Sequence, residues 1–300
     1  MKAPHFTTGA RIGTADASET GVARVRKVIE KSWIDAAAFV IIGIIFIVPF
    51  VFILLTAAKT QQEAAQLAFT WPSPFQLWAN LRDVVAFGNY RMVLALWNST
   101  VLTVGSVTLI VVLSAMVAYV MQRRRDRVAS VAGTVMLAGL IIPPAIVPTI
   151  FLLQSLGLYK TIPGLIMVNV ASHLPFGILL LRAFMGTIPR ELDEAAIIDG
   201  ASPLRVFVSI VLPLLKPAIV TIIVVQSVGI YNDFAGPLYF LPGAENVTVQ
   251  LTLYTYISQF SSQWNLLFAN VLVVTIPPLI MFIFFRRQIV AGMTAGGVKG

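Results

Sequence analysis

The side chains that could carry out chemistry in this chain are few, and their spacing argues against most kinds of active site. The 300 residues include no cysteine and two histidines, His5 and His173, which lie far apart and form no HExxH pattern. A metal site needs several ligands brought together, so we expect no disulfide and no metal ion. The phosphate-binding pattern GxxxxGK(S/T) does not occur either. The sequence therefore predicts no catalytic residues and no cofactor.

The polar residues that remain are concentrated in a hairpin over residues 189–217, between two long apolar segments. Pro189 suits the first position of a helix, and the acids that follow it place negative charge where the helix dipole favours it. Gly200 is expected to end this helix, because glycine adopts a left-handed C-terminal conformation without strain. Ser202 and Pro203 suit the N-cap and first position of a second helix. The pattern predicts an elbow of two short helices.

The elbow also carries apolar side chains that a solvated loop does not need. Together they would form a compact apolar surface suited to docking another protein, made of Ile197, Ile198, Leu204 and Phe207. The alternative is an elbow that lies in the lipid headgroup layer and braces its own helices. Glu194 could contact a basic residue of a partner or favour its own helix N-terminus, and Asp199 could cap or pair near the turn. Pro213 and Pro217 are expected to break the second helix before the fifth span.

Long apolar segments surround the elbow. The chain is 58% hydrophobic and 11% charged, whereas a soluble domain carries about 25% charged residues. About 20 apolar residues in a helix cross the hydrocarbon core of a membrane, and continuous apolarity excludes the alternating pattern of a barrel. We expect an all-α, polytopic membrane protein with six transmembrane helices. These are Trp33–Leu55, Ser99–Met121, Val128–Leu153, Ile162–Met185, Ala218–Leu238 and Trp264–Phe285.

The basic residues predict the orientation of these helices. If both termini are cytoplasmic, all but four of the 21 Lys and Arg residues lie on the cytoplasmic side, as the positive-inside rule requires. The four outside are Lys59, Arg82, Arg91 and Lys160. The net charge of +8 then reflects the orientation of the spans in the membrane. The partner of these basic residues is the lipid bilayer, with its anionic headgroups. No nucleic-acid partner is expected.

The same reading divides the chain into four parts. Residues 1–31 form a cytoplasmic N-terminal tail. Residues 32–98 hold an uncleaved first span and an extracytoplasmic segment with short surface helices. Residues 99–285 form a core of five spans that includes the elbow, and residues 286–300 form a cytoplasmic tail. The pair Pro143-Pro144 interrupts the third span, which suits a translocation path and is also common as a packing feature.

Further candidates lie within the predicted spans. Asp233 is sixteen residues beyond Pro217, or about 24 Å at 1.5 Å per residue. An ionisable residue in a membrane is a functional candidate by default, and this depth favours a structural or gating role over direct contact with a solute. His173 could line a path or bond to a neighbouring helix. Asn265 and Asn270 are expected to form hydrogen bonds between helices.

The elbow sequence resembles a known motif. Its residues are Glu194, Ala195, Ala196, Gly200, Ile210, Leu212 and Pro213. Their spacing is similar to that of the EAA motif in permease subunits of binding-protein-dependent ABC importers. Residues 189–202, the sequence Asn232-Asp233-Phe234 and the tail 292–300 resemble the maltose-type carbohydrate permeases. The similarity covers roughly residues 90–300, with departures at Tyr231, usually tryptophan, and Gly297, usually alanine.

The resemblance implies a type I ABC importer permease architecture and a set of partners. Such permeases pair with a second, homologous permease around one pathway, above two ATPase subunits, and an extracytoplasmic solute-binding protein delivers the solute. The elbow is implied to be the coupling helix that docks on an ATPase subunit. The implied coupling residues are Glu194, Ala195, Ala196, Ile198, Asp199, Gly200, Leu204 and Phe207. The implied pathway or gate residues are Asn232, Asp233 and His173.

The chain is therefore interpreted as the transmembrane subunit of an ATP-driven importer of a sugar or sugar-like solute in a prokaryotic inner membrane. ATP hydrolysis is expected on the separate ATPase subunits. One alternative within the class is a permease for a non-sugar solute, such as a glycerol phosphodiester or a polyol. A self-contained secondary transporter is the alternative from another class, and it should show an internal repeat or several ionisable residues at the membrane midplane. A non-transporting scaffold would not need a kinked core together with a docking elbow.

Overall fold

The computed structural model describes residues 38–124, 126–256 and 262–297, and the chain divides into two units, residues 1–53 and 54–300. In the first unit the described residues belong to the helix Ala38–Ala57. Its most apolar stretch has a mean hydropathy of 3.2 and no buried residue, so it is long and apolar enough to cross a membrane. The predicted tail 1–31 and the expected start of the first span at Trp33 lie outside the described residues.

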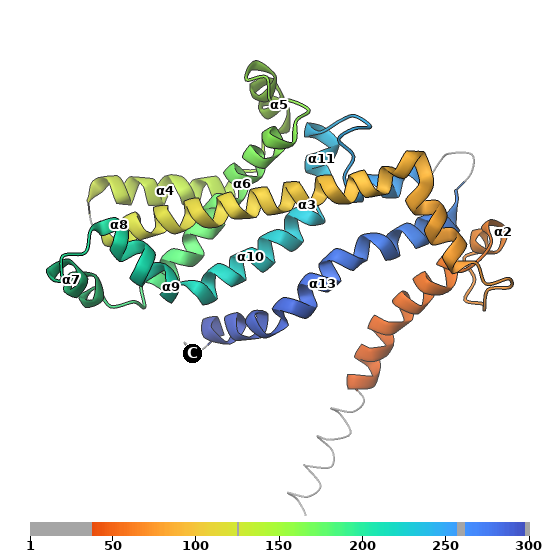
Figure 1. The fold of residues 1–300 in the computed structure, drawn as a ribbon, viewed down its shortest axis with the longest axis horizontal. Coiled ribbons are helices and arrows are strands. Elements are labelled where there is room, and N and C mark those ends of the chain that lie inside the picture. The colour runs from red at the N-terminus through yellow and green to blue at the C-terminus, as the bar shows by residue number, and fades with distance from the viewer. Residues whose placement is uncertain (1–37, 125, 257–261, 298–300) are drawn as a thin grey trace, which may run out of the picture. The chain divides into compact units, whose positions relative to one another are not determined.

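The described part of the chain is helical, without strands, as predicted (Figure 1). Four single helices are long and apolar enough to span a membrane: Ala38–Ala57, α3 (Leu77–Arg123), α6 (Ile162–Met185) and residues Trp264–Arg286 of α13 (Trp264–Gly297). Two bent pairs pass the same criteria: α4 (Arg127–Ile141) with α5 (Ile146–Ser155), and Pro203–Leu214 with α10 (Lys216–Tyr231). If each bent pair is one span, the described helices supply the six predicted spans.

Helix α3 is longer than the predicted second span. It follows the short helix α2 (Gln61–Ala65) and merges the expected surface helices with the span into one element of 47 residues. The backbone leaves helical geometry from Phe87 to Tyr90, where Gly88 has a φ of 58° and Asn89 a φ of 59°. Asn and Gly tolerate this left-handed region best. The kink therefore separates an N-terminal arm, residues 77–86, from the long straight part of α3, residues 91–123.

The third span is broken, at the place where two prolines were expected to interrupt it. Helices α4 and α5 meet at an angle of 114°. Neither Pro143 nor Pro144 has an N–H to donate, and a proline disfavours helical geometry in the residue before it. The pair therefore ends α4 and turns the chain into a new direction (Figure 1).

The central packing of the second unit joins α3, α6 and α10, with α13 against α10 and α3. Helices α3 and α6 approach closely at Gly177, which has no side chain to hold them apart. A Cβ added there would lie only 3.0 Å from the Cβ of Ser114. Asn169 of α6 also donates a hydrogen bond to the hydroxyl of Ser106 on α3, at 3.3 Å. The buried apolar side chains between these helices include Ile110, Leu165, Leu181, Met185, Leu215 and Ile222.

The last part of the chain returns through α11 (Ala235–Phe240), α12 (Val249–Thr252) and η2 (Leu253–Tyr256) to α13. The side-chain amide of Asn265 donates to Asn80 of α3 at 3.0 Å, and that of Asn270 donates to Thr252 of α12 at 3.0 Å. Both bonds join different elements, as predicted for these two residues. Helix α10 ends at Tyr231, seven residues before the predicted end at Leu238, so Asp233 lies in a break between helices.

Candidate functional site

The elbow is built from α7 (Glu191–Ile198), α8 (Pro203–Val206), the π-helical turn η1 (Phe207–Val211) and α9 (Leu212–Leu214). Helix α7 starts two residues later than predicted. Arg190 is its N-cap, and the Arg190 carbonyl accepts from the N–H groups of Asp193 and Glu194 at 2.9 and 3.1 Å. Pro189 therefore precedes the cap instead of opening the helix.

The turn between α7 and α8 has the predicted chemistry. Gly200 has a φ of +82°, in the left-handed region, and the N–H of Ala201 reaches back to the carbonyl of Ala196 at 2.9 Å. The Ser202 hydroxyl accepts from the N–H of Arg205 at 3.4 Å, and Pro203 is the first residue of α8. These contacts confirm Gly200 as the end of the first helix and Ser202 as the cap of the second.

The second elbow helix ends where predicted, between Pro213 and Pro217 and before the fifth span, but Pro213 itself does not break it. The helical path runs through Pro213, and the 71° bend falls at Leu215, before α10. A proline ring inside a helix clashes with the preceding turn and removes one N–H. Here the turn before it is a π-turn, in which the N–H of Leu212 donates to the carbonyl of Phe207. This wider turn accommodates the proline.

The coupling residues implied by the sequence divide into two faces. Ile198 and Leu204 are 85% and 70% exposed, and the exposed set also contains Glu194, Ala195, Asp199 and Gly200. Ala196, by contrast, is buried in the main core, and Phe207 packs against that core with its ring 5.1 Å from the ring of Tyr119. The elbow therefore exposes Ile198 and Leu204 beside two acidic residues, and it uses Ala196 and Phe207 to attach itself to its own bundle.

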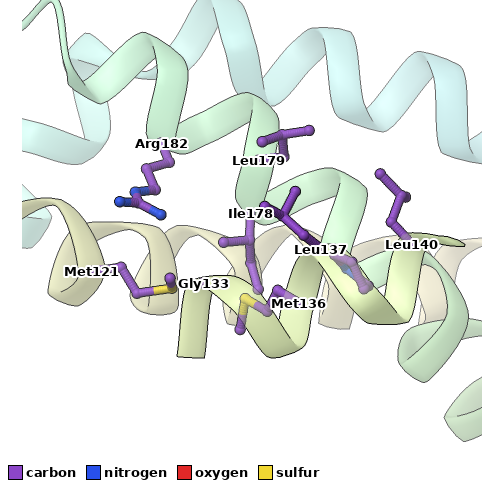
Figure 2. A pocket seen from close by; sticks show the side chains of 9 residues that line it. Met121, Gly133, Met136, Leu137, Leu140, Ile178, Leu179 and Arg182 are labelled. Carbon is purple, nitrogen blue, oxygen red and sulfur yellow. The ribbon is translucent and has the colours of Figure 1, made fainter. Parts of the chain in front are cut away.

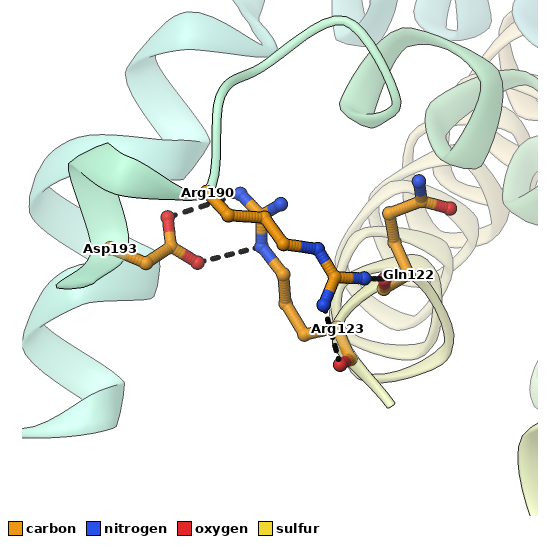
Figure 3. A network of polar contacts seen from close by, with 4 residues as sticks. All are labelled: Gln122, Arg123, Arg190 and Asp193. Atoms are coloured by element: carbon orange, nitrogen blue, oxygen red, sulfur yellow. Dashed lines mark hydrogen bonds and ion pairs between the residues drawn. The ribbon is translucent and has the colours of Figure 1, made fainter. Parts of the chain in front are cut away.

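A polar network joins the elbow to the end of α3, and sequence reasoning missed it (Figure 3). The guanidinium of Arg123 pairs with the carboxylate of Asp193, with Nε–Oδ2 at 2.6 Å and Nη2–Oδ1 at 3.1 Å. The Arg190 side chain donates to the backbone carbonyl of Gln122 at 2.6 Å. The available signal was the position of Asp193, three residues before Ala196 and so on the same, inward face of α7.

The turn between α3 and α4 has its own local pair. Arg124 and Asp126 form an exposed ion pair at 2.6 Å, and Asp126 caps α4 by accepting from the N–H of Ala129 at 2.9 Å. The Ala129 N–H, followed by Arg124, stabilises the charged form and lowers the pKa of the Asp126 carboxyl below its ordinary value. Asp126 therefore stabilises the start of α4 in its ionised form.

The second candidate site is a pocket of about 320 Å³ between α6, α10 and α11. His173 and Asp233 both line it, together with the polar side chains of Asn169 and Ser172 and the ring of Tyr239. Asp233 is held in place at the break after α10, where its carboxylate accepts from the N–H of Gly236 at 3.1 and 3.2 Å. A volume of this size and a mostly apolar wall with a few polar groups suit a small-molecule site.

The third pathway candidate does not lie in this pocket. The side-chain oxygen of Asn232 accepts from Gln250 at 3.0 Å, and its amide donates to the carbonyl of Val228. The next residue, Phe234, stacks on Tyr254 with ring centroids 4.8 Å apart. Asn232 and Phe234 therefore attach the end of α10 to the segment before α13. Of the three predicted pathway residues, the structure brings together His173 and Asp233.

A smaller cavity between α4 and α6 is an unsuitable solute site (Figure 2). Its volume is about 60 Å³, and its wall is apolar apart from Arg182. Small-molecule pockets usually measure about 300–1,000 Å³. No cluster of three or more His, Cys or acidic residues that could hold a metal ion occurs among the described residues.

Comparisons with known proteins agree on one family. A family profile described as "Binding-protein-dependent transport system inner membrane component" matches residues 110–293. The diacetylchitobiose uptake system permease protein NgcG of Streptomyces coelicolor is 31% identical, over 88% of this chain and 87% of that protein. The melibiose/raffinose/stachyose import permease protein MelC of Bacillus subtilis is 28% identical, over 84% of this chain and 91% of that protein. A chain of a bacterial alginate import ABC transporter shares the fold, with a TM-score of 0.77, 20% identity and coverage of 87% and 97%.

Proposed function

The chain belongs to the family of inner membrane components of binding-protein-dependent transport systems, and on that premise we propose that it forms half of the pathway of an ATP-driven sugar importer. It is a multi-pass protein of the cytoplasmic membrane. Its partners are a second, homologous permease, ATPase subunits and an extracytoplasmic solute-binding protein. The sugar class is supported by similarity to permeases for diacetylchitobiose and for melibiose, raffinose and stachyose. In this proposal both termini are cytoplasmic, as the distribution of basic residues favours.

The observation that carries the proposal is the exposed apolar surface of the elbow. Ile198 and Leu204 stand 85% and 70% exposed on a polar hairpin whose own attachment to the bundle uses other residues. Exposed apolar side chains of this kind mark a docking surface. The elbow then binds an ATPase subunit, and ATP is hydrolysed on that subunit and not on this chain.

Purification from the native membrane in mild detergent tests the proposal, with mass spectrometry of the chains that accompany the protein. Wild type should bring an ATPase and a second permease, and Ile198→Asp with Leu204→Asp should deplete the ATPase alone. Trp71→Asp is a matched control, because Trp71 is an exposed apolar residue, at 77%, in the segment between α2 and α3. A wild-type protein that purifies alone and stable would reject the proposal in favour of a self-contained transporter.

The pathway part of the proposal assigns the pocket of His173 and Asp233 to the solute route. Polar side chains beside the ring of Tyr239 suit the binding of a sugar. The hydroxyl groups of a sugar form hydrogen bonds with polar side chains, and its apolar face packs on an aromatic ring. Because the chain has no cysteine, Ser172→Cys provides a unique thiol in the pocket. Its reaction with a water-soluble methanethiosulfonate reagent should change when ATP and vanadate are added to the complex. Leu238→Cys, exposed on α11 but outside the pocket lining, should show no such change. Equal behaviour of the two thiols would reject this assignment.

A further inference from the structure

The elbow is tied to α3 by contacts of a different kind from the rest of its packing. Its apolar contacts, through Ala196, Val206 and Val211, are non-directional. The pair of Arg123 and Asp193 is directional, because Nη2 donates a hydrogen bond to Oδ1 at 3.1 Å while Nε lies 2.6 Å from Oδ2 in the same ion pair. Both side chains are largely shielded from water, at 15% and 10% exposure, so the pair is screened less than a surface ion pair.

A second contact fixes the orientation of the elbow. Arg190 is the N-cap residue of α7, and its guanidinium donates to the backbone carbonyls of Gln122 at 2.6 Å and Arg123 at 3.5 Å. These carbonyls belong to the last turn of α3, which has no intrahelical donors for them. The start of α7 and the end of α3 therefore share two attachments, which oppose rotation as well as separation (Figure 3).

The part of α3 that follows the kink is also attached near its start, to the segment before α12 and to the first residue of α12. The side-chain amide of Asn98 donates to the carbonyls of Glu245 and Val247, each at 3.1 Å. The N–H of Val249 donates to the hydroxyl of Ser99 at 3.0 Å. Between Asn98 and Arg123 the helix has no non-helical residue, and its length over these 25 residues is about 37 Å at 1.5 Å per residue.

We propose that Arg123, Asp193 and Arg190 are positioning residues that make the elbow and the straight part of α3 one moving body. A displacement of the elbow by its ATPase then reaches residues 245–249 at the opposite end of the bundle without passing through the solute pocket. This inference rests on the proposed function, since it needs an ATPase to move the elbow. The two ends are coupled through one rigid element with a defined attachment at each end.

Distance measurements between two spin labels test whether the elbow and α3 move together. The chain has no cysteine, so Leu109→Cys on α3 and Leu192→Cys on α7, both exposed, give the only two labels on this chain. The complete complex is measured in lipid nanodiscs without nucleotide and with MgATP and vanadate. The distribution of distances between the two labels should be narrow, and its mean should be the same in both states. A separation that changes with nucleotide would overturn the proposal, because the elbow would then hinge on α3.

Variants of the ion pair complete the test. Asp193→Asn should broaden the distance distribution, and the exchanged pair Arg123→Asp with Asp193→Arg should restore the narrow one. Arg124→Gln is the matched control, since it removes an ion pair of the same 2.6 Å length that lies within one turn. A distribution as narrow in Asp193→Asn as in wild type would also overturn the proposal. Failure of the proposed function would appear differently, as a wild-type protein without an associated ATPase.

Discussion

Gly200 is the position where one added methyl group should affect coupling most specifically. Its φ of +82° lies in the left-handed region, and a Cβ built there would meet nothing within 4 Å. Gly200→Ala therefore adds no clash, and its cost is the backbone strain of a left-handed L-residue, about 1–2 kcal/mol. A cost of this size changes a conformational equilibrium by a factor of about 5–30. The affinity of the purified permease pair for its ATPase should fall by up to this factor, because an undocked elbow relaxes the strain and docking must restore it; the measurement is a titration with the separately purified ATPase in nanodiscs.

Gly157 provides the matched control for this prediction. It has a φ of +69° and equally open space, but it lies in the turn between α5 and α6, away from the elbow. Gly157→Ala should therefore cost similar backbone strain and leave the affinity for the ATPase unchanged. Gly200→Asn should fall between wild type and Gly200→Ala, since asparagine tolerates left-handed geometry better than alanine. Equal losses of affinity in Gly200→Ala and Gly157→Ala would refute the reasoning, because the elbow conformation would then not control docking.

Three further predictions concern the cap of α4 and the contacts of α3 and α6. The pKa of the Asp126 carboxyl is lowered in the folded protein. Its contribution to the stability of the fold is therefore fully present above the ordinary carboxyl pKa and is lost as pH falls through the folded-state pKa. The difference in melting temperature between wild type and Asp126→Ala should shrink in that acid range. Asn98→Ala should cost about 1–3 kcal/mol by leaving the buried carbonyl of Val247 unsatisfied. It should also speed limited proteolysis near residues 245–247, and a rate of proteolysis equal to that of wild type would contradict this prediction. Gly177→Ala should cost about 1–3 kcal/mol of stability by overpacking against Ser114. The melting temperature should recover when Ser114→Gly is added. A melting temperature that does not recover would place the strain elsewhere.

Local signals in the sequence were enough to predict most of the elements. Continuous apolarity identified the spans, two prolines marked the break between α4 and α5, and Gly200 and Ser202 marked the turn of the elbow. Each of these features depends on residues within a turn or two of one another. The sequence pattern also led to the family, because the elbow motif and the elements around it are contiguous in the chain.

Other features depended on contacts between distant parts of the chain. Arg123 and Asp193 are 70 residues apart in the sequence. Taken singly, Arg123 indicates only the cytoplasmic side of a span, and Asp193 is an acid near the start of a helix. His173 and Asp233 share a pocket because α6 lies against α10 and α11, which no local pattern specifies. The inward direction of Phe207 likewise follows from the π-turn before Pro213 and from the ring of Tyr119.

The sequence by itself thus determined the helical membrane class, the elbow and its turn, since hydropathy, capping and left-handed geometry are properties of short segments. Only the tertiary structure decided which face of the elbow is free and which is tied to α3. An arginine at a helix end can pair with any acid that the fold brings within reach. The choice of Asp193 follows from the fold that brings α7 and η1 to α3, where Ala196 and Val211 are buried in the core and Phe207 meets Tyr119.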